Sequence, residues 1–467
     1  MSVSATGWLA RVGLADREES LGAALGRSRL VGAVWGAGLW LHDRLRPAIA
    51  TSVVAKLAEP LSVAAVALVC VSLPYVHTGV NAALVLIAFA LTLLRLFVQP
   101  DTRARFSNLD LCVLAFAAMH LVATGFSPFL MASVKGLAKM VIFWMGYFSF
   151  RQTLQTRRAR TVVLAALFLG VTAESMYGIY QWKIHVPPLG TWEDPNDVDP
   201  VTRVYGHLLN PNLLAGYVLP AIPLAVTALL TWRRALKVLA LATLATAPLC
   251  LWFTYSRGAF LAIIATAVCY LALGVVLNWS RIKESKPALY TLFGGVTAAV
   301  IGVAGRIATN HSVRERVVSI FTLRGDSSNS FRMNVWTGVF RMLHDYWVFG
   351  IGVGNVAFRH MYPLYMMSGF EALGAYNVFL EVFTELGIFG LLVFVWLLLS
   401  FLARTLYTVF TAEGENRWWA IALLAALVGT GVMGMFDTVF YRPAIQLQFW
   451  LLLALVIAVS PRREQVQ

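Results

Sequence analysis

The residues that could do chemistry lie in a few short segments, and two of these segments hold an arginine beside turn-forming residues. Thr254-Tyr255-Ser256-Arg257-Gly258 predicts a tight turn between two apolar stretches, with Arg257 at their edge. Arg332 follows Ser330 and Phe331 at a predicted helix start. An arginine at the edge of a membrane is costly, and its planar guanidinium matches phosphate oxygens. Arg257 and Arg332 therefore predict an anion site, and we expect them to share one cavity.

A second polar group precedes the sixth apolar stretch. Asn210-Pro211-Asn212 is typical of a helix start, because asparagine caps helices and proline is tolerated in the first turn. Arg203 and His207 lie just upstream. Backbone N–H groups at a helix start can bind an anion, so Arg203, His207, Asn210 and Asn212 are candidate substrate-binding residues. A capped membrane helix without a ligand is the alternative.

The third polar group, Tyr376, Asn377, Glu381 and Glu385, opens the tenth apolar stretch. Glu381 and Glu385 share one helix face. Acids at a helix start are favoured by the helix dipole, so a structural role is at least as well supported as catalysis. We expect the shared cavity of the two arginines to lie near Asn210, Asn212 and Tyr376.

Other titratable residues are less informative. His207 and His360 are candidate general bases, although a lone histidine is more often structural. Glu174 is an acid inside an apolar stretch, for which we expect a hydrogen-bond partner within the bundle. The four cysteines fall inside apolar stretches without metal-ligand spacing, and no carboxylate cluster stands out. We predict neither a metal nor another cofactor.

The elements that must position these residues are membrane-spanning helices. Hydrophobic residues make up 59% of the chain and charged residues 13%, whereas soluble domains have roughly 45–50% and 25%. A span needs about 20 apolar residues. The sequence predicts an all-α polytopic membrane protein with twelve spans, at 58–76, 80–98, 109–126, 133–150, 161–182, 209–231, 236–253, 259–279, 287–305, 386–410, 418–436 and 443–460.

The basic residues predict the orientation. With both termini cytoplasmic, 23 of the 37 lysines and arginines fall on the cytoplasmic side, as the positive-inside rule requires. We therefore predict an inner-membrane protein, and the net charge of +14 gives no reason to invoke nucleic acid. The predicted divisions are a basic interfacial segment at 1–57, spans one to nine at 58–305, a periplasmic loop at 306–373, spans ten to twelve at 374–460, and a tail at 461–467.

The periplasmic loop is predicted to be folded. Apolar residues recur at helical spacing over 311–321 and 330–345, and Phe331, Trp336 and Phe340 require burial. Arg324 lies in the turn between these helices and is a further candidate substrate-binding residue. The glycine-rich segment at 350–355 predicts a tight turn, and it is a weak signal for a nucleotide site. The loop should form at least two short helices packed over the bundle.

The chain resembles the O-antigen ligase/polymerase (Wzy_C-type) superfamily. The resemblance covers nearly the whole chain and is carried by three stretches in order: Arg203-Val204-Tyr205-Gly206 to Asn210-Pro211-Asn212, Thr254-Tyr255-Ser256-Arg257-Gly258, and Arg324-Gly325-Asp326-Ser327-Ser328-Asn329. These stretches look most like the IctB-like branch, which is described as a group of inorganic-carbon (bicarbonate) transporters.

The ligase members of this superfamily transfer a glycan from a polyprenyl-pyrophosphate carrier to an acceptor hydroxyl at the outer face of the inner membrane. The resemblance implies that Arg257 is the arginine of their S-R-G turn, and Arg332 is our candidate for the arginine of their large loop. Their third residue is a histidine before an asparagine, but Tyr376 stands there, before Asn377. With an ordinary pKa of about 10, a tyrosine is a poor base at neutral pH.

Three functions remain open. The first is a metal-independent, GT-C-like glycan ligase or polymerase of the cell envelope, with the bilayer, an undecaprenyl-pyrophosphate-linked glycan and a glycan or lipid acceptor as partners. The second is bicarbonate transport or inorganic-carbon accumulation. Transport sites near the midplane are commonly built from paired broken spans, and the sequence has no such repeated pair. The third is non-catalytic binding of a lipid or glycan.

Overall fold

The computed structural model describes residues 52–98, 107–189, 202–285 and 327–461, with scattered further positions before and between these ranges. It is an all-α protein, and no β-strand occurs in the described ranges. The helices are α4 (Val53–Ser72), α5 (Thr78–Val98), α6 (Asn108–Gly125), α7 (Leu130–Thr153), α8 (Arg157–Lys183), α9 (Pro211–Val218), α10 (Ala221–Thr231), α11 (Ala235–Phe253), α12 (Arg257–Glu284), α15 (Ser327–Tyr346), α16 (Asn355–Met361), α17 (Val378–Thr411), α18 (Gly414–Gly434) and α19 (Pro443–Val459). Three short 3-10 helices join them: η2 (Gly206–Leu208), η3 (Tyr362–Leu364) and η4 (Val439–Tyr441).

The apolar helices confirm a polytopic membrane protein. In the described part of the chain, nine helices are long and apolar enough to cross a bilayer, counting α9 and α10 as one. Two further predicted spans correspond to α7 and to the 17-residue α19. Three predictions fall mostly on residues that the structure does not describe: the span at 287–305, the helix at 311–321 and the basic segment at 1–57. Arg324 also lies outside the described residues. The count of twelve spans therefore stays a prediction.

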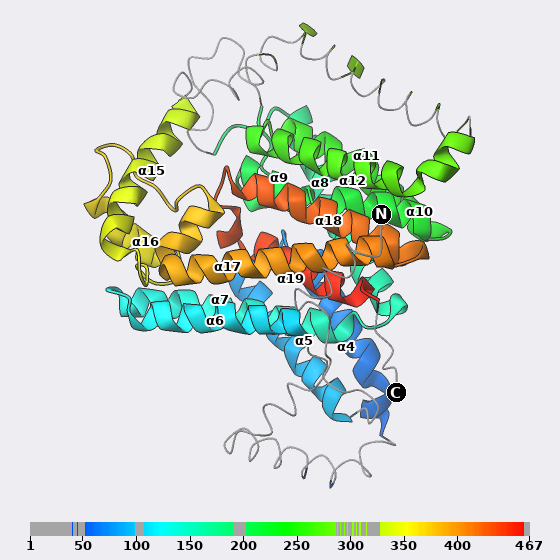
Figure 1. Ribbon diagram of the computed structural model, residues 1–467, viewed down its shortest axis with the longest axis horizontal. Coiled ribbons are helices and arrows are strands. Elements are labelled where there is room, and N and C mark those ends of the chain that lie inside the picture. Colours follow the sequence, from blue (N-terminus) through cyan, green and yellow to red (C-terminus); the bar gives the residue numbers. More distant parts are fainter. Residues whose placement is uncertain are drawn as a thin grey trace.

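Burial separates inner from outer helices. In the α9–α10 span, 83% of the apolar window is buried, whereas only 17% is buried in α12. A helix that is apolar on all sides either lies within a protein core or faces lipid. The long helices run side by side, and α4 and α5 incline away from the others (Figure 1).

Residues 327–373 form a cap at one end of the bundle, beside the start of α17 (Figure 1). The helix predicted at 330–345 is confirmed as α15, and α16 and η3 follow it. The cap has its own apolar core, composed of Val335, Val339, Met342, Leu343, Ile351, Phe358, Met361, Tyr362 and Ala375. The expected burial of Phe340 is wrong, because its side chain is 56% exposed. The buried positions of α15 (335, 339, 342 and 343) are centred on another part of the helix surface, so position 340 lies beyond the edge of the buried face.

A break in α17 joins the cap to the bundle. At Gly387 the backbone has φ 69° and ψ −171°, so the helix is interrupted there. The freed backbone groups pair with the glycine-rich turn: Ile351 N–H donates to the carbonyl of Thr384 at 2.8 Å, Gly352 N–H to Glu385 at 3.1 Å, and Ile388 N–H to Trp347 at 2.8 Å. Buried backbone groups require such partners. The predicted tight turn thus fixes the orientation of the first turns of α17, which carry Glu381 and Glu385.

Candidate anion site

The three segments predicted from the sequence use the same local structure. A residue other than glycine adopts the left-handed conformation, and the next residue caps a helix. Leu209 (φ 59°) precedes the cap Asn210 of α9, Tyr255 (φ 48°) precedes the cap Ser256 of α12, and Tyr376 (φ 50°) precedes the cap Asn377 of α17. Left-handed backbone costs about 1–3 kcal/mol when glycine is absent, and it clusters at functional sites.

Each cap side chain accepts N–H groups of the first helical turn. Asn210 Oδ1 accepts from the N–H groups of residues 212 and 213 at 2.8 and 3.3 Å, and Asn377 Oδ1 from those of 379 and 380 at 2.9 and 3.0 Å. Ser256 Oγ accepts from the N–H of residue 259 at 3.4 Å. The capping role predicted for Asn210 is confirmed, and the positive end of each helix dipole is fixed in direction.

All three helix starts contact one segment, Met435–Thr438, between α18 and η4. Asn377 Nδ2 donates to the Met435 carbonyl at 3.0 Å, and the Tyr376 N–H donates to Thr438 Oγ1 at 2.7 Å. Gly258, next to Arg257, lies so close to Phe436 that a Cβ added there would be 3.1 Å from the Phe436 Cβ. We call Met435–Thr438 the hub. The hub was not predicted from the sequence.

Asp437 is the charged residue of the hub and is only 8% exposed. Its carboxylate accepts from Asn212 Nδ2 at 2.5 Å and from the Thr438 N–H at 2.7 Å. Burial raises the pKa of Asp437 above its ordinary value, and the positive charges of Arg332 and Arg203 oppose that rise. The buried acid therefore has two of the predicted arginines close enough to act on its charge.

Arg203 joins the first segment to the second. Its Nε donates to the Thr254 carbonyl at 3.0 Å, and its Nη2 donates to Asn212 Oδ1 at 3.4 Å. The side chain is 8% exposed. Arg203, Asn212 and Asp437 thus form one continuous polar network at the start of α9.

Arg257 is the first residue of α12 and is partly exposed. Arg332 is in the second turn of α15 and is also partly exposed. The ring of Tyr376 lies 5.6 Å from that of Phe331, the neighbour of Arg332, in an edge-to-face arrangement. Arg332 is linked to the hub through Asp437, and Arg257 through the contact of Gly258 with Phe436. That both guanidinium groups bind one ligand stays a prediction.

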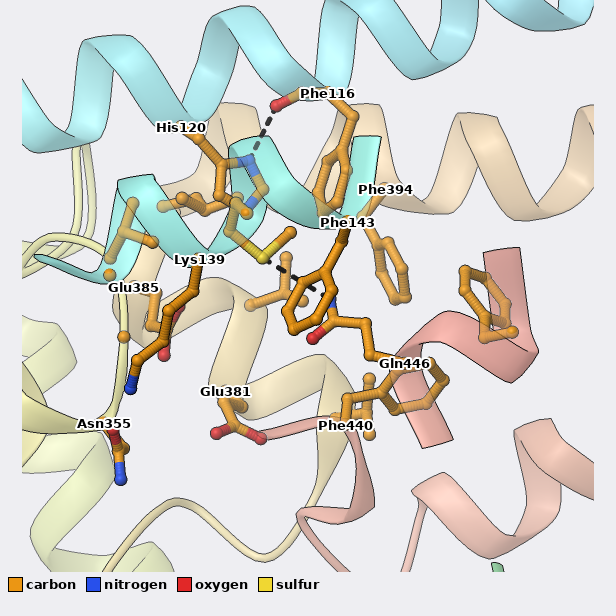
Figure 2. Close-up of a pocket in the computed structure, with 18 of the residues that line it drawn as sticks. Phe116, His120, Lys139, Phe143, Asn355, Glu381, Glu385, Phe394, Phe440 and Gln446 are labelled. Carbon is orange, nitrogen blue, oxygen red and sulfur yellow. Dashed lines mark hydrogen bonds between the residues drawn. The ribbon is translucent and has the colours of Figure 1, made fainter. Parts of the chain in front are cut away.

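A cavity of about 110 Å³ lies beside the hub, between α6, α7, the first turns of α17 and α19 (Figure 2). Its lining includes the aromatic side chains of Phe116, Phe143, Phe394, Phe440, Phe449 and Trp450, together with the charged Lys139, Glu381 and Glu385. Glu385 lies near Lys139 at one side of this cavity (Figure 2). Glu381, by contrast, reaches Thr438 and so connects the cavity with the hub.

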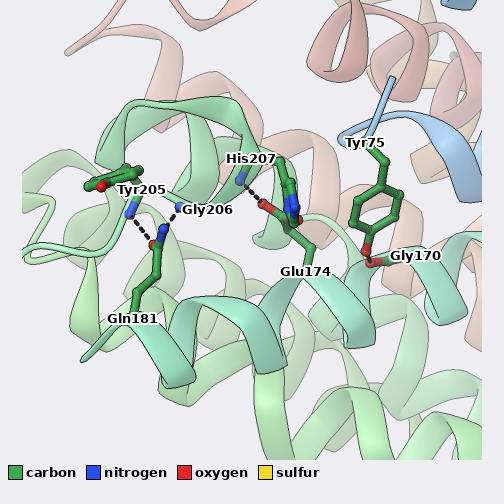
Figure 3. A network of polar contacts seen from close by, with 7 residues as sticks. All are labelled: Tyr75, Gly170, Glu174, Gln181, Tyr205, Gly206 and His207. Atoms are coloured by element: carbon green, nitrogen blue, oxygen red, sulfur yellow. Dashed lines mark hydrogen bonds and ion pairs between the residues drawn. The ribbon is translucent and has the colours of Figure 1, made fainter. Parts of the chain in front are cut away.

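Two predicted residues lie apart from the hub contacts. The ring of His360, on α16, packs against Phe129 at a centroid distance of 5.3 Å. His207, in η2, pairs with Glu174 of α8, which supplies the hydrogen-bond partner expected for that acid: His207 Nδ1 lies 2.8 Å from Glu174 Oε2, and the His207 N–H donates to Glu174 Oε1 at 2.7 Å (Figure 3). Among the described residues, no three His, Cys, Asp or Glu side chains gather closely enough to hold a metal ion.

The fold and the site define a multi-pass membrane protein in which three capped helix starts and two arginines surround a buried acid. Residues 238–395 match the family model described as O-Antigen ligase. The matched stretch begins within α11, ends within α17 and includes Arg257, Arg332 and Tyr376. Asn212 precedes the matched residues and Asp437 follows them. No curated protein matches the chain.

Proposed function

We propose that this protein transfers a glycan from a polyprenyl-pyrophosphate carrier, such as undecaprenyl pyrophosphate, to a hydroxyl group of a glycan or lipid acceptor. The observation that carries the proposal is the meeting of three capped helix starts, Arg203 and Arg332 around the hub. Helix starts and guanidinium groups both favour a multiply charged anion. A pyrophosphate supplies such an anion at the membrane surface. In this proposal the cap lies on the periplasmic side of the inner membrane.

The chemistry requires stabilisation of the leaving pyrophosphate. As the bond between the sugar and the pyrophosphate breaks, negative charge builds up on the phosphate oxygens. Donors already fixed in direction stabilise that charge without having to reorganise. Arg203 is held by the Thr254 carbonyl and by Asn212, and the cap residues hold the helix starts. Arg257 and Arg332 supply the bidentate contacts in this proposal.

The aromatic cavity beside the hub suits the apolar part of the carrier. Five phenylalanines and Trp450 are among its lining residues, and so is Glu381, which reaches the hub through Thr438. A carrier lipid needs an apolar surface directly beside its charged end. Asp437 would hold Asn212 and the arginines in place before the lipid binds, since an unliganded cluster of positive charge is unstable without a counter-ion.

Binding of polyprenyl pyrophosphate to purified protein in nanodiscs tests the proposal, with the polyprenyl alcohol of equal length as the reference ligand. Arg257→Lys and Arg332→Lys should each weaken binding about tenfold or more, because lysine keeps the charge but loses the planar fork. Tyr376→Phe should have a smaller effect. The matched control is Arg359→Lys, at an exposed arginine of α16, which should bind like the wild type.

Two results would overturn the proposal. One is a wild-type protein that binds the pyrophosphate lipid no better than the alcohol. The other is normal binding by both Arg257→Lys and Arg332→Lys. Uptake of labelled bicarbonate into proteoliposomes, without binding of the pyrophosphate lipid, would support the transport alternative instead.

A further inference from the structure

A histidine and a buried carboxylate form a dyad at the end of the bundle that carries the hub, and the pyrophosphate-binding chemistry does not use them. Glu174 is fully buried in α8, and both of its oxygens face His207. One oxygen accepts the backbone N–H of His207 and the other contacts the ring at Nδ1 (Figure 3). The carboxylate thus fixes both the position and the orientation of the imidazole. The side chain of His207 is nevertheless 42% exposed.

Two tyrosine side chains also contact the imidazole ring of His207. Tyr177 lies against the imidazole at a centroid distance of 4.3 Å, and Tyr75 approaches it edge to face at 5.2 Å. The Tyr75 hydroxyl is itself held by the Gly170 carbonyl at 2.6 Å. With Nδ1 against Glu174 and two rings alongside, Nε2 is the ring nitrogen that does not contact the carboxylate.

The backbone just before His207 is held by the side chain of Gln181. Gln181 Oε1 accepts the N–H groups of Tyr205 and Gly206 at 3.1 and 2.8 Å (Figure 3). Gly206 has φ 58°, and a Cβ at this position would lie 2.1 Å from Glu174 Oε1. Only glycine therefore allows the chain to pass this close to the carboxylate.

We infer that His207 is the general base that accepts the proton of the acceptor hydroxyl, with Glu174 as its positioning residue. This inference rests on the proposed glycan transfer. A carboxylate on Nδ1 keeps the proton on that nitrogen and leaves Nε2 with a lone pair. Arg203 lies four residues before His207, and four residues span at most about 14 Å. The base and the phosphate-binding network thus belong to one short stretch of chain.

The step balances in protons and electrons. The acceptor hydroxyl transfers its proton to His207 Nε2 while its oxygen forms a bond to the anomeric carbon of the donor sugar. The bond from that carbon to the pyrophosphate oxygen breaks, and its electron pair leaves with the pyrophosphate. His207 later releases the proton to water. The imidazolium that forms is stabilised by Glu174.

The test compares His207→Gln, Glu174→Gln and His207→Ala with the wild type in two assays: binding of polyprenyl pyrophosphate, and the transfer rate of a polyprenyl-pyrophosphate-linked oligosaccharide as a function of pH. We expect His207→Gln to bind the lipid like the wild type and to transfer about 100-fold more slowly or worse. Added imidazole should partly restore transfer by His207→Ala, because the space between Tyr75 and Tyr177 can hold it.

Glu174→Gln should move the acidic limb of the rate profile to lower pH, because an amide no longer stabilises the imidazolium. The titratable groups that face this dyad are Tyr75 and Tyr177 at the ring, and Tyr217 and Cys250 behind the carboxylate. The matched control is His344→Gln, at a histidine of α15 whose side chain is 88% exposed. It should change neither assay.

The possible results distinguish failure of His207 as the general base from failure of the proposed glycan transfer. Normal transfer and an unchanged pH profile in His207→Gln, with lipid binding intact, would overturn the base and leave the proposed function standing. Loss of lipid binding in both His207 variants would also overturn it, because His207 would then be a structural residue. If the wild type does not bind the pyrophosphate lipid, the proposed function fails, and the base fails with it.

Discussion

Replacing Gly387 by alanine tests whether the break in α17 holds the cap on the bundle. The backbone at this residue has φ 69° and ψ −171°, a combination that is essentially restricted to glycine. A Cβ at this position would lie 2.1 Å from the carbonyl oxygen of Val348, in the segment that leads into the glycine-rich turn. The segment must therefore move away or the helix must rewind.

The size of the effect follows from the contacts that would be lost. The backbone strain alone costs about 1–3 kcal/mol. Moving the segment away also breaks the three backbone hydrogen bonds at the break, of residues 351, 352 and 388, each worth about 0.5–1.5 kcal/mol. The sum is about 2.5–7.5 kcal/mol. A loss of this size is comparable to the whole stability of many domains, so we expect local detachment of the cap before general unfolding.

Hydrogen–deuterium exchange of the purified protein measures this detachment directly. In Gly387→Ala, amides of residues 347–354 should exchange at least about 100-fold faster, since 1.4 kcal/mol corresponds to a factor of ten. Gly431→Ala is the matched control: Gly431 lies inside α18, and a Cβ there meets nothing within 4 Å. It should leave exchange unchanged and, by helix propensity, stabilise α18 by up to about 1 kcal/mol. Equal exchange in the two variants would refute the role assigned to the break.

Two further predictions concern the hub. Because burial raises the pKa of Asp437, this acid gains its proton as the pH falls toward that raised value, and the site becomes more positive. On acidification, the binding of polyprenyl pyrophosphate should therefore strengthen by up to roughly tenfold more in the wild type than in Asp437→Asn. Parallel pH profiles of the two proteins would contradict this prediction. Asn377→Ala removes a helix cap and the bond to the Met435 carbonyl, so the free energy of unfolding should fall by about 2 kcal/mol. Asn377→Asp keeps the helix-capping oxygen, so its free energy of unfolding, measured by denaturant titration, should fall by about half as much. Equal losses in the two variants would show that helix capping by Asn377 contributes nothing to stability.

The sequence was sufficient for features that depend on neighbours along the chain. The apolar stretches predicted the helices, and the Asn210-Pro211-Asn212 stretch predicted a capped start that the structure confirms. The periodic residues at 330–345 likewise predicted α15. Each of these signals is local, because helix periodicity and capping involve residues within about one turn or two of each other.

Features that depend on distant residues were missed. Asp437 follows a predicted span, and nothing in its neighbours indicates that Asn212 and Arg332, more than 100 residues away, act on it. A single acid among apolar residues at a span end was the available signal. The break at Gly387 was likewise absent from the prediction, because the carbonyls it frees are paired by a turn over 30 residues upstream. Glycine in an apolar run does not by itself reveal such a partner.

The backbone of Tyr376 explains how a tyrosine can stand where the ligase pattern has a histidine. Tyr376 is left-handed, its N–H is bound to Thr438, and it precedes the cap of α17. These contacts use its backbone, so the residue can contribute to the site by shape while its side chain takes no proton. Under the proposed glycan transfer the acceptor hydroxyl requires a base, and that base then lies elsewhere than at position 376. His207 stands at the first of the three helix starts, oriented by a buried carboxylate. In the proposed mechanism, the hub binds the anion and the segment that leads into α9 accepts the proton.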